Sequence, residues 1–175
     1  MRILFLGDVV GISGCSKILN NLKAEIVKRN INFVIVNGEN SDDTGVGLTK
    51  EICNDFYSCG VNVITTGNHV WDQKDIMSFI EKENRLLRPH NLFELSPGKG
   101  FEIYETSNDL KIGVLNLMGN VFMKKCDDVF EASRKFLKTH QLKKHYDLLV
   151  VDFHGEITSE KNAIGHFFDG KATLV

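Results

Sequence analysis

Short apolar runs recur along the chain, and four of them are followed at once by small and polar residues. These four runs are Ile3–Leu6, Phe33–Val36, Val61–Thr66 and Leu148–Val151. Runs of this length bounded by turn-forming residues indicate buried β-strands. A further run at the end of the chain, Ala172–Val175, predicts one more strand.

Apolar residues at helical spacing fill the stretches between these strands. The predicted helices are a segment around Leu19–Val27, then Thr49–Cys59, Asp72–Lys82 and Val129–Lys144. Gly60 is the expected stop of the second helix, and Asp72 the expected N-cap of the third. His140 and His145 are expected to be exposed helical residues.

The middle of the chain has a different pattern. Two runs, Phe101–Tyr104 and Lys111–Leu117, are separated by Ser107-Asn108-Asp109, which predicts antiparallel strands joined by a turn. Elsewhere strands alternate with helices, the pattern of an α/β fold. We therefore expect residues 1–175 to form a single α/β domain.

Composition narrows the class of protein. The chain has 175 residues, a formal net charge of −2 and four cysteines, with no paired cysteine motif. No basic field is present to hold a long nucleic acid by its phosphates. No apolar stretch approaches the roughly 20 residues of a membrane span. A cytoplasmic protein that acts on a small molecule is expected, and self-association into a homo-oligomer remains open.

The polar residues that follow the four runs are metal-ligand types. Asp8, Glu39, Asn68 and His154 each come directly after a predicted strand. Because sites in α/β sheets form at the carboxyl ends of strands, these side chains could converge. Each has a structural alternative when taken singly, but four in succession favour a metal site. Mixed oxygen and imidazole ligation suits iron, manganese or zinc, and a carboxylate such as Glu39 could bridge two ions.

His69 follows Asn68 directly and has two interpretations. It could project toward a substrate and donate a proton to the leaving oxygen. It could equally make only a hydrogen bond within its loop. Spacing alone leaves both open.

A nucleotide-binding loop is a competing interpretation of the first motif. Gly7, Gly11 and Gly14 lie between the first strand and the first helix. The G-x-G pair of that fingerprint is missing, so this interpretation is weaker than the metal site.

The ordered motifs resemble the YmdB-like branch of the calcineurin-type metallophosphoesterases. The similar segments are Gly7-Asp8, Asn37-Gly38-Glu39-Asn40, Gly67-Asn68-His69-x-Trp71-Asp72, Leu87-Arg88-Pro89-x-Asn91, Asn116-Leu117-x-Gly119 and Asp152-Phe153-His154-Gly155-Glu156-x-Thr158-Ser159-Glu160-Lys161. The resemblance implies an αββα sandwich and a phosphodiesterase acting on cyclic nucleotides, with 2′,3′-cyclic nucleotides favoured. It implies two transition-metal ions, iron above manganese or zinc. Asp8, Glu39, Asn40, Asn68 and His154 match its metal ligands, and His69 matches its catalytic histidine.

The chain also departs from the family pattern. Family members continue into a Gly-Thr-His-Thr-His motif with two further histidine ligands, whereas this sequence ends at Val175. We therefore expect a fold incomplete at its C-terminal side and a weakened metal site. His90, His140, His145 and His166 fall outside the motifs. Ser41-Asp42-Asp43 stands where the family carries small residues, and its carboxylates could repel a phosphate or simply face water.

Two alternative functions follow. The chain could be a catalytically silent product that acts at most as a binding or interaction protein. It could also be a phosphomonoesterase or nucleotidase, because the same pair of metals can serve monoesters.

Overall fold

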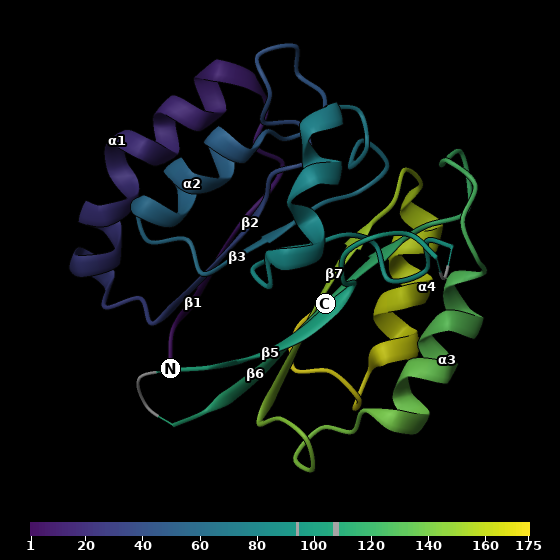
Figure 1. The fold of residues 1–175 in the computed structure, drawn as a ribbon. Helices are drawn as coiled ribbons and strands as arrows, with labels where there is room; N and C mark the ends of the chain where they lie inside the picture. Colours follow the sequence, from purple (N-terminus) through teal and green to yellow (C-terminus); the bar gives the residue numbers. More distant parts are fainter. Residues whose placement is uncertain (94, 107–108) are drawn as a thin grey trace. The chain divides into compact units, whose positions relative to one another are not determined.

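A computed structural model describes residues 1–93, 95–106 and 109–175 and shows two compact units, Met1–Leu86 and Leu87–Val175. The elements of each unit are labelled in Figure 1. No helix in these ranges combines the length and apolar character needed to cross a membrane.

The first unit is built on a four-stranded sheet of order β1-β2-β3-β4. Its elements are β1 (Ile3–Leu6), α1 (Gly11–Arg29), β2 (Phe33–Asn37), α2 (Lys50–Ser58), β3 (Val63–Thr65), η1 (Lys74–Ser78), η2 (Ile80–Lys82) and the first residue of β4 (Leu86–Leu87), whose second residue begins the other unit. β1 pairs with β2 and β2 with β3 in parallel register. The three apolar runs predicted as strands in this unit are therefore confirmed. Parallel pairing brings the carboxyl ends of β1, β2 and β3 to one edge of this sheet.

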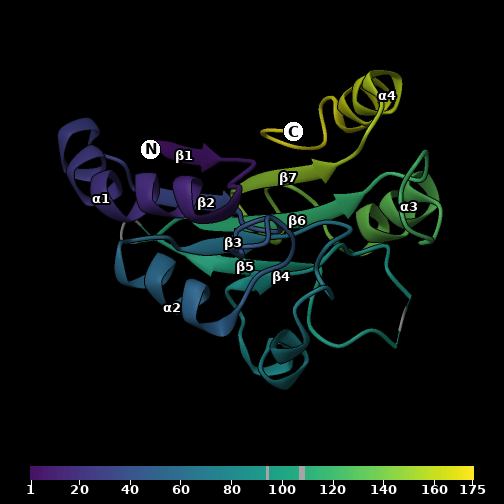
Figure 2. The ribbon, with the colours of Figure 1, turned by 90° about the horizontal axis from the view of Figure 1, so that it is seen from above.

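The first two helices follow from local sequence signals. α1 buries Ile18 and Leu22 and ends at Asn30, which adopts a left-handed φ of 51°. α2 begins at its N-cap Thr49, whose side chain accepts a hydrogen bond from Ile52 N at 3.3 Å. Gly60, with φ of 108°, ends the turn after it. Both helices cover the same face of the sheet (Figures 1 and 2).

The predicted helix over Asp72–Lys82 is wrong in type. The segment forms the two short 3₁₀-helices η1 and η2, and the N-cap of η1 is Gln73, without a side-chain cap. Ile76, Phe79 and Ile80 are nevertheless buried. A spacing of three or four residues buries one face in either helix type, so the apolar pattern does not separate them. Asp72 does not cap the helix because its carboxylate contacts the ring of His69.

The second unit contains a three-stranded sheet of order β5-β6-β7. Its elements are β5 (Phe101–Glu105), β6 (Lys111–Met118), α3 (Val129–Thr139), β7 (Leu148–His154) and α4 (Thr158–Phe168). β5 is antiparallel to β6, as predicted, and β6 is parallel to β7. Of the predicted turn between β5 and β6, Ser107 and Asn108 lie outside the described residues. Figure 2 shows the three strands side by side, with α3 and α4 at the end of β6 and β7.

Aromatic and aliphatic side chains form the core of the second unit. Leu115, Leu117, Phe136, Val151 and Phe168 belong to one buried cluster between the sheet and its two helices. The run Ala172–Val175 meets β7 through a parallel bridge between Leu174 and Val150 rather than as a full strand.

The predicted helix Val129–Lys144 is too long. Asp128 caps α3 by accepting a hydrogen bond from Glu131 N at 2.7 Å, and the helix ends at Thr139. His140 stacks on Phe136 with ring centroids 4.6 Å apart, and His145 accepts a hydrogen bond from Gln141 N at 3.0 Å. Both histidines are half-buried and lie outside the helix, so their assignment as exposed helical residues is wrong.

Candidate metal centre

The loops that follow β1 and β2 are joined by backbone hydrogen bonds. Val9 N donates to Asn37 O at 3.1 Å, and Gly11 N donates to Asn40 O at 2.8 Å. Asp8 therefore stands beside the Asn37–Asn40 loop, at the carboxyl edge of the sheet. Gly38 N donates to Thr65 O at 3.0 Å, which connects the same loop to the end of β3.

Asp8 and Glu39 form a close pair of carboxylates. An oxygen of each lies within 4.8 Å of the other, and Glu39 is only 1% exposed. Two like charges at this distance, one of them removed from water, repel each other. A bound cation would turn this repulsion into attraction, so the pair fits a metal ion.

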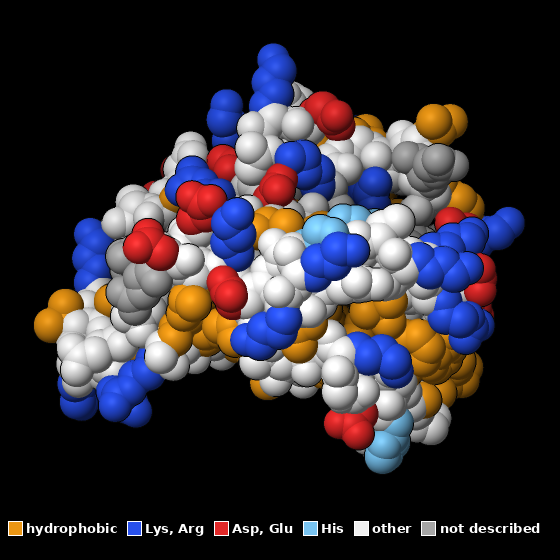
Figure 3. All heavy atoms as spheres, turned by 90° about the horizontal axis from the view of Figure 1, so that it is seen from below, with side chains coloured by type: hydrophobic (Ala, Val, Ile, Leu, Met, Phe, Trp, Pro, Cys, Tyr) orange, Lys and Arg blue, Asp and Glu red, His pale blue; other side chains and the backbone are white. Residues whose placement is uncertain are grey.

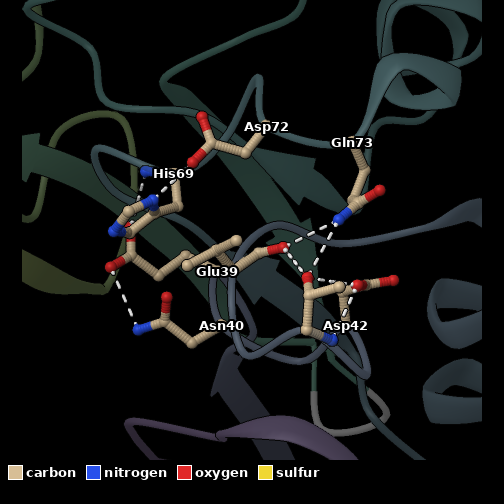
Figure 4. Close-up of polar contacts among 8 residues, drawn as sticks. Glu39, Asn40, Asp42, His69, Asp72 and Gln73 are labelled. Atoms are coloured by element: carbon tan, nitrogen blue, oxygen red, sulfur yellow. Dashed lines mark hydrogen bonds and ion pairs between the residues drawn. The ribbon is translucent and has the colours of Figure 1, made fainter.

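The two asparagines lie on the loops next to these carboxylates. Asn40 directs its Nδ2 to Glu39 Oε1 at 3.4 Å (Figure 4), which leaves the amide oxygen as the atom able to bind a cation. Asn68 is half-buried in the turn after β3, where Val70 N donates to Gly67 O at 3.3 Å. The structure thus brings Asp8, Glu39, Asn40 and Asn68 to one edge of the first unit's sheet.

His69 is oriented by contacts on two sides. Its backbone N donates to Glu39 Oε2 at 3.3 Å, and its ring Nδ1 lies 2.5 Å from Asp72 Oδ2. A carboxylate at Nδ1 fixes the ring plane and leaves Nε2 as the nitrogen able to exchange a proton with a ligand. The His69 side chain is 30% exposed, so part of it is in contact with solvent.

Sequence reasoning missed the role of Asp72. The available signal was the three-residue interval from His69 to Asp72, which one turn of chain can close. Asp72 N also donates to His69 O at 3.1 Å, so backbone and side chain together hold the pair.

Gln73 connects this pair to the loop after Glu39. Its Nε2 donates to Val46 O at 2.9 Å and to Thr44 Oγ1 at 3.4 Å (Figure 4). Gly47 packs so closely that a Cβ there would lie 2.7 Å from Gln73 Cγ. The loop is thus fastened to the residue that follows Asp72.

Asp42 of the Ser41-Asp42-Asp43 segment braces this same loop. Its Oδ1 accepts hydrogen bonds from Thr44 Oγ1 at 2.6 Å and Thr44 N at 3.0 Å. These bonds hold the pKa of the Asp42 carboxyl below its usual range. Asp43 is exposed to solvent. Asp43 therefore faces water, and Asp42 has a structural role in the loop.

His154 belongs to the second unit, where it is the last residue of β7 and pairs with Met118 of β6. Its carbonyl oxygen accepts a hydrogen bond from Gly119 N at 2.8 Å, and its side chain is half-buried. The imidazole is therefore at the carboxyl end of a parallel strand pair, the position predicted for it.

The histidines outside the motifs have other surroundings. His90 is largely buried against Phe136, and burial together with the Arg88 charge lowers its pKa to about 4. His166 lies on the exposed face of α4. Neither environment indicates a ligand.

The family model of YmdB-like proteins matches residues 4–175. The chain therefore belongs to the YmdB-like protein family. It is 39% identical over its full length to a Bacillus subtilis protein named 2′,3′-cyclic-nucleotide 2′-phosphodiesterase. It is 36% identical over 181 aligned residues to a Mycoplasma genitalium protein named putative phosphatase/phosphodiesterase.

Solved structures confirm the fold class. A Thermus thermophilus protein described as hypothetical matches 99% of the chain with a TM-score of 0.90 and 34% identity. A Mycoplasma pneumoniae protein described as a novel phosphatase matches 99% of the chain with a TM-score of 0.88 and 37% identity. The α/β metallophosphoesterase fold implied by the resemblance is thus confirmed.

The chain spans less than two thirds of the length of the curated YmdB-like relatives that it matches. It covers 65% of the B. subtilis protein and 62% of the M. genitalium protein. Among the structures it covers 66% of the T. thermophilus chain and 62% of the M. pneumoniae chain.

Proposed function

We propose that this chain is a metal-dependent phosphodiesterase that hydrolyses cyclic nucleotides, with 2′,3′-cyclic nucleotides its favoured class. The observation that carries the proposal is the close Asp8 and Glu39 pair beside a histidine held by a carboxylate. The similarity of the chain to a protein named for this activity supports the choice of substrate.

Five side chains would hold two transition-metal ions, with iron preferred over manganese or zinc. They are Asp8, Glu39, Asn40 and Asn68 of the first unit and His154 of the second. Two such ions polarise phosphoryl oxygens and neutralise the charge that develops as a phosphate ester is cleaved. Carboxylate, amide and imidazole ligands together match the preference of these metals.

His69 would supply the proton for the leaving group. Asp72 holds the ring through Nδ1, so Nε2 can donate a proton to the ribose 2′ oxygen as the bond from phosphorus to that oxygen breaks. Water supplies the hydroxyl that replaces it on phosphorus, and the product is a 3′-monophosphate. Proton donation matters here because an unprotonated alkoxide is a poor leaving group.

A small substrate agrees with the charge of the chain. Its formal net charge is −2, and basic and acidic side chains are interspersed on the face shown in Figure 3. Long nucleic acids bind instead to continuous basic surfaces.

The direct test is turnover by the purified chain after loading with iron(II), manganese(II) or zinc. We expect metal bound in about stoichiometric amount and conversion of 2′,3′-cyclic AMP to 3′-AMP, followed by chromatography. Release of 2′-AMP would contradict the assignment of the leaving oxygen. The function would be refuted if the chain bound none of the three metals and showed no turnover with any of them.

A phosphomonoesterase is the second candidate, because two relatives carry phosphatase in their names. Comparing kcat/KM for 2′,3′-cyclic AMP and 3′-AMP separates the two activities. Faster hydrolysis of the monophosphate would favour the phosphomonoesterase.

The Asp72→Asn variant tests the positioning of His69. We expect kcat for 2′,3′-cyclic AMP to fall about 10- to 100-fold, because an amide holds the ring less firmly, while KM changes little. Combining Asp72→Asn with His69→Ala should cost no more than His69→Ala alone, since the two residues act as one unit. Additive losses would show that Asp72 acts elsewhere. Asp43→Asn, an exposed carboxylate in the same unit, is the matched control.

A further inference from the structure

Phe122 is an aromatic residue whose side chain is exposed to solvent. It is 84% exposed, in the segment between β6 and α3. Its φ is 60°, in the left-handed region that bulky side chains rarely adopt. Exposure forgoes the burial that would normally stabilise a phenylalanine, and the backbone conformation adds strain.

The start of this segment is fixed by a buried carboxylate. Glu160 of α4 is 8% exposed, and its two oxygens accept hydrogen bonds from Asn120 N at 2.8 Å and Val121 N at 3.4 Å. A Cβ at Gly119 would lie 2.3 Å from Glu160 Oε2, so a larger residue there would displace this carboxylate. The backbone that leads into Phe122 is therefore held from within the unit.

The far side of the segment is fixed as well. Asn120 accepts a hydrogen bond from Val129 N at 3.0 Å and donates Nδ2 to Asp127 O at 3.1 Å. Asn91 donates Nδ2 to Asp127 O at 3.0 Å and to Met118 O at 2.8 Å. Phe122 is thus an exposed residue of a loop whose two ends are tied together.

This loop begins next to His154. β6 and β7 run parallel, Met118 pairs with His154, and Gly119 N donates to His154 O at 2.8 Å. Phe122 follows three residues later in the chain. Ligands of α/β sheets bind beyond the carboxyl ends of their strands, which is where this loop lies.

We propose that Phe122 is the platform on which the nucleobase of the substrate stacks. The inference rests on the proposed function. If the phosphate is held at His154, the base lies about one ribose from that residue. An aromatic ring can stack on any base through its π-face, which gives affinity with little sequence preference. Val121, the preceding residue of the same loop, is 39% exposed and also apolar. Recognition of a base accounts for both the strain and the exposure.

The test compares substrates that have a base with one that lacks it. In Phe122→Ala, KM for 2′,3′-cyclic AMP should rise about tenfold with kcat nearly unchanged, and the rise should be smaller for 2′,3′-cyclic CMP, because stacking on purines is stronger. Methyl ribofuranoside 2′,3′-cyclic phosphate, which carries no base, should be cleaved equally by both proteins. Phe122→Trp should restore the KM for the nucleotides.

A matched control is Leu95→Ala, which removes another apolar side chain, 97% exposed, from the same unit. It should leave every KM unchanged. An equal rise in KM for the base-free substrate, or no rise for either nucleotide, would overturn the platform while leaving the phosphodiesterase function intact. If the wild-type chain turned over no substrate, the function would fail, and calorimetry with 2′,3′-cyclic AMP would still decide. Equal affinity of wild type and Phe122→Ala would then overturn the platform.

Discussion

Replacing His69 with alanine is expected to lower kcat for 2′,3′-cyclic AMP by about 100- to 10,000-fold, the range found for removal of a positioned general acid. The structure supports this because Asp72 holds Nδ1 of the ring at 2.5 Å and leaves Nε2 to act on the substrate. The ribose oxygen needs a proton as it leaves. Without the imidazole, only water can provide it.

The leaving group distinguishes proton donation from other roles of His69. Bis-p-nitrophenyl phosphate releases p-nitrophenolate, which is stable without protonation, so His69→Ala should reduce its turnover by less than about tenfold. Metal content should stay at the wild-type level. His166→Ala, on the exposed face of α4, is the control and should match wild type on both substrates. Equal losses with the two substrates would show that His69 does not act as the proton donor.

The strand ends could be predicted because two independent signals agree there. Each apolar run is short and flanked by small residues, and each delivers a ligand-type side chain immediately after it. Asp8 after β1 and Glu39 after β2 illustrate this, since parallel pairing alone brings their loops together. The proximity of these two carboxylates was thus implicit in the order of apolar and polar residues.

The partner of His69 could not be predicted in the same way. Asp72 precedes a stretch with helical spacing, and an aspartate in that position is usually an N-cap. In the structure its carboxylate turns to the imidazole, while the first 3₁₀-helix begins after Gln73 without a side-chain cap. Periodicity of apolar residues reports which face is buried, not which helix type forms or where a polar side chain points.

The end of α3 was missed for a related reason. Lys143 and Lys144 continue the polar face that a helix would present, so the pattern shows no break after Thr139. Beyond Thr139 the chain makes a tertiary contact instead, in which the ring of His140 lies against Phe101 of β5 with centroids 4.7 Å apart. The local spacing of apolar residues does not predict contacts between residues of different elements.

Glu39→Gln is expected to abolish most metal binding and to lower kcat/KM for 2′,3′-cyclic AMP by on the order of a thousandfold. The ions supply several kcal/mol of charge stabilisation to the reaction, and about 1.4 kcal/mol corresponds to a factor of ten. Glutamine keeps the shape of the side chain. Its oxygen can still accept from His69 N, and the Asn40 amide can rotate to accept from the new NH₂ group. The loss would therefore report on charge rather than on packing.

The same substitution should have the opposite effect on the metal-free protein. Without a cation, the charges of Asp8 and Glu39 repel each other, because their carboxylate oxygens lie within 4.8 Å and Glu39 is buried. Removing one charge should raise the free energy of unfolding by about 1 kcal/mol, measured by urea denaturation in the presence of a chelator. Metal should then stabilise wild type but not the variant, because only the form that binds the ion gains from it. Glu51→Gln changes an exposed carboxylate in the first turn of α2 and is the matched control. It should neither raise the free energy of unfolding nor abolish the stabilisation by metal. A variant that kept its metal, or lost stability without it, would show that Glu39 is a structural carboxylate rather than a ligand.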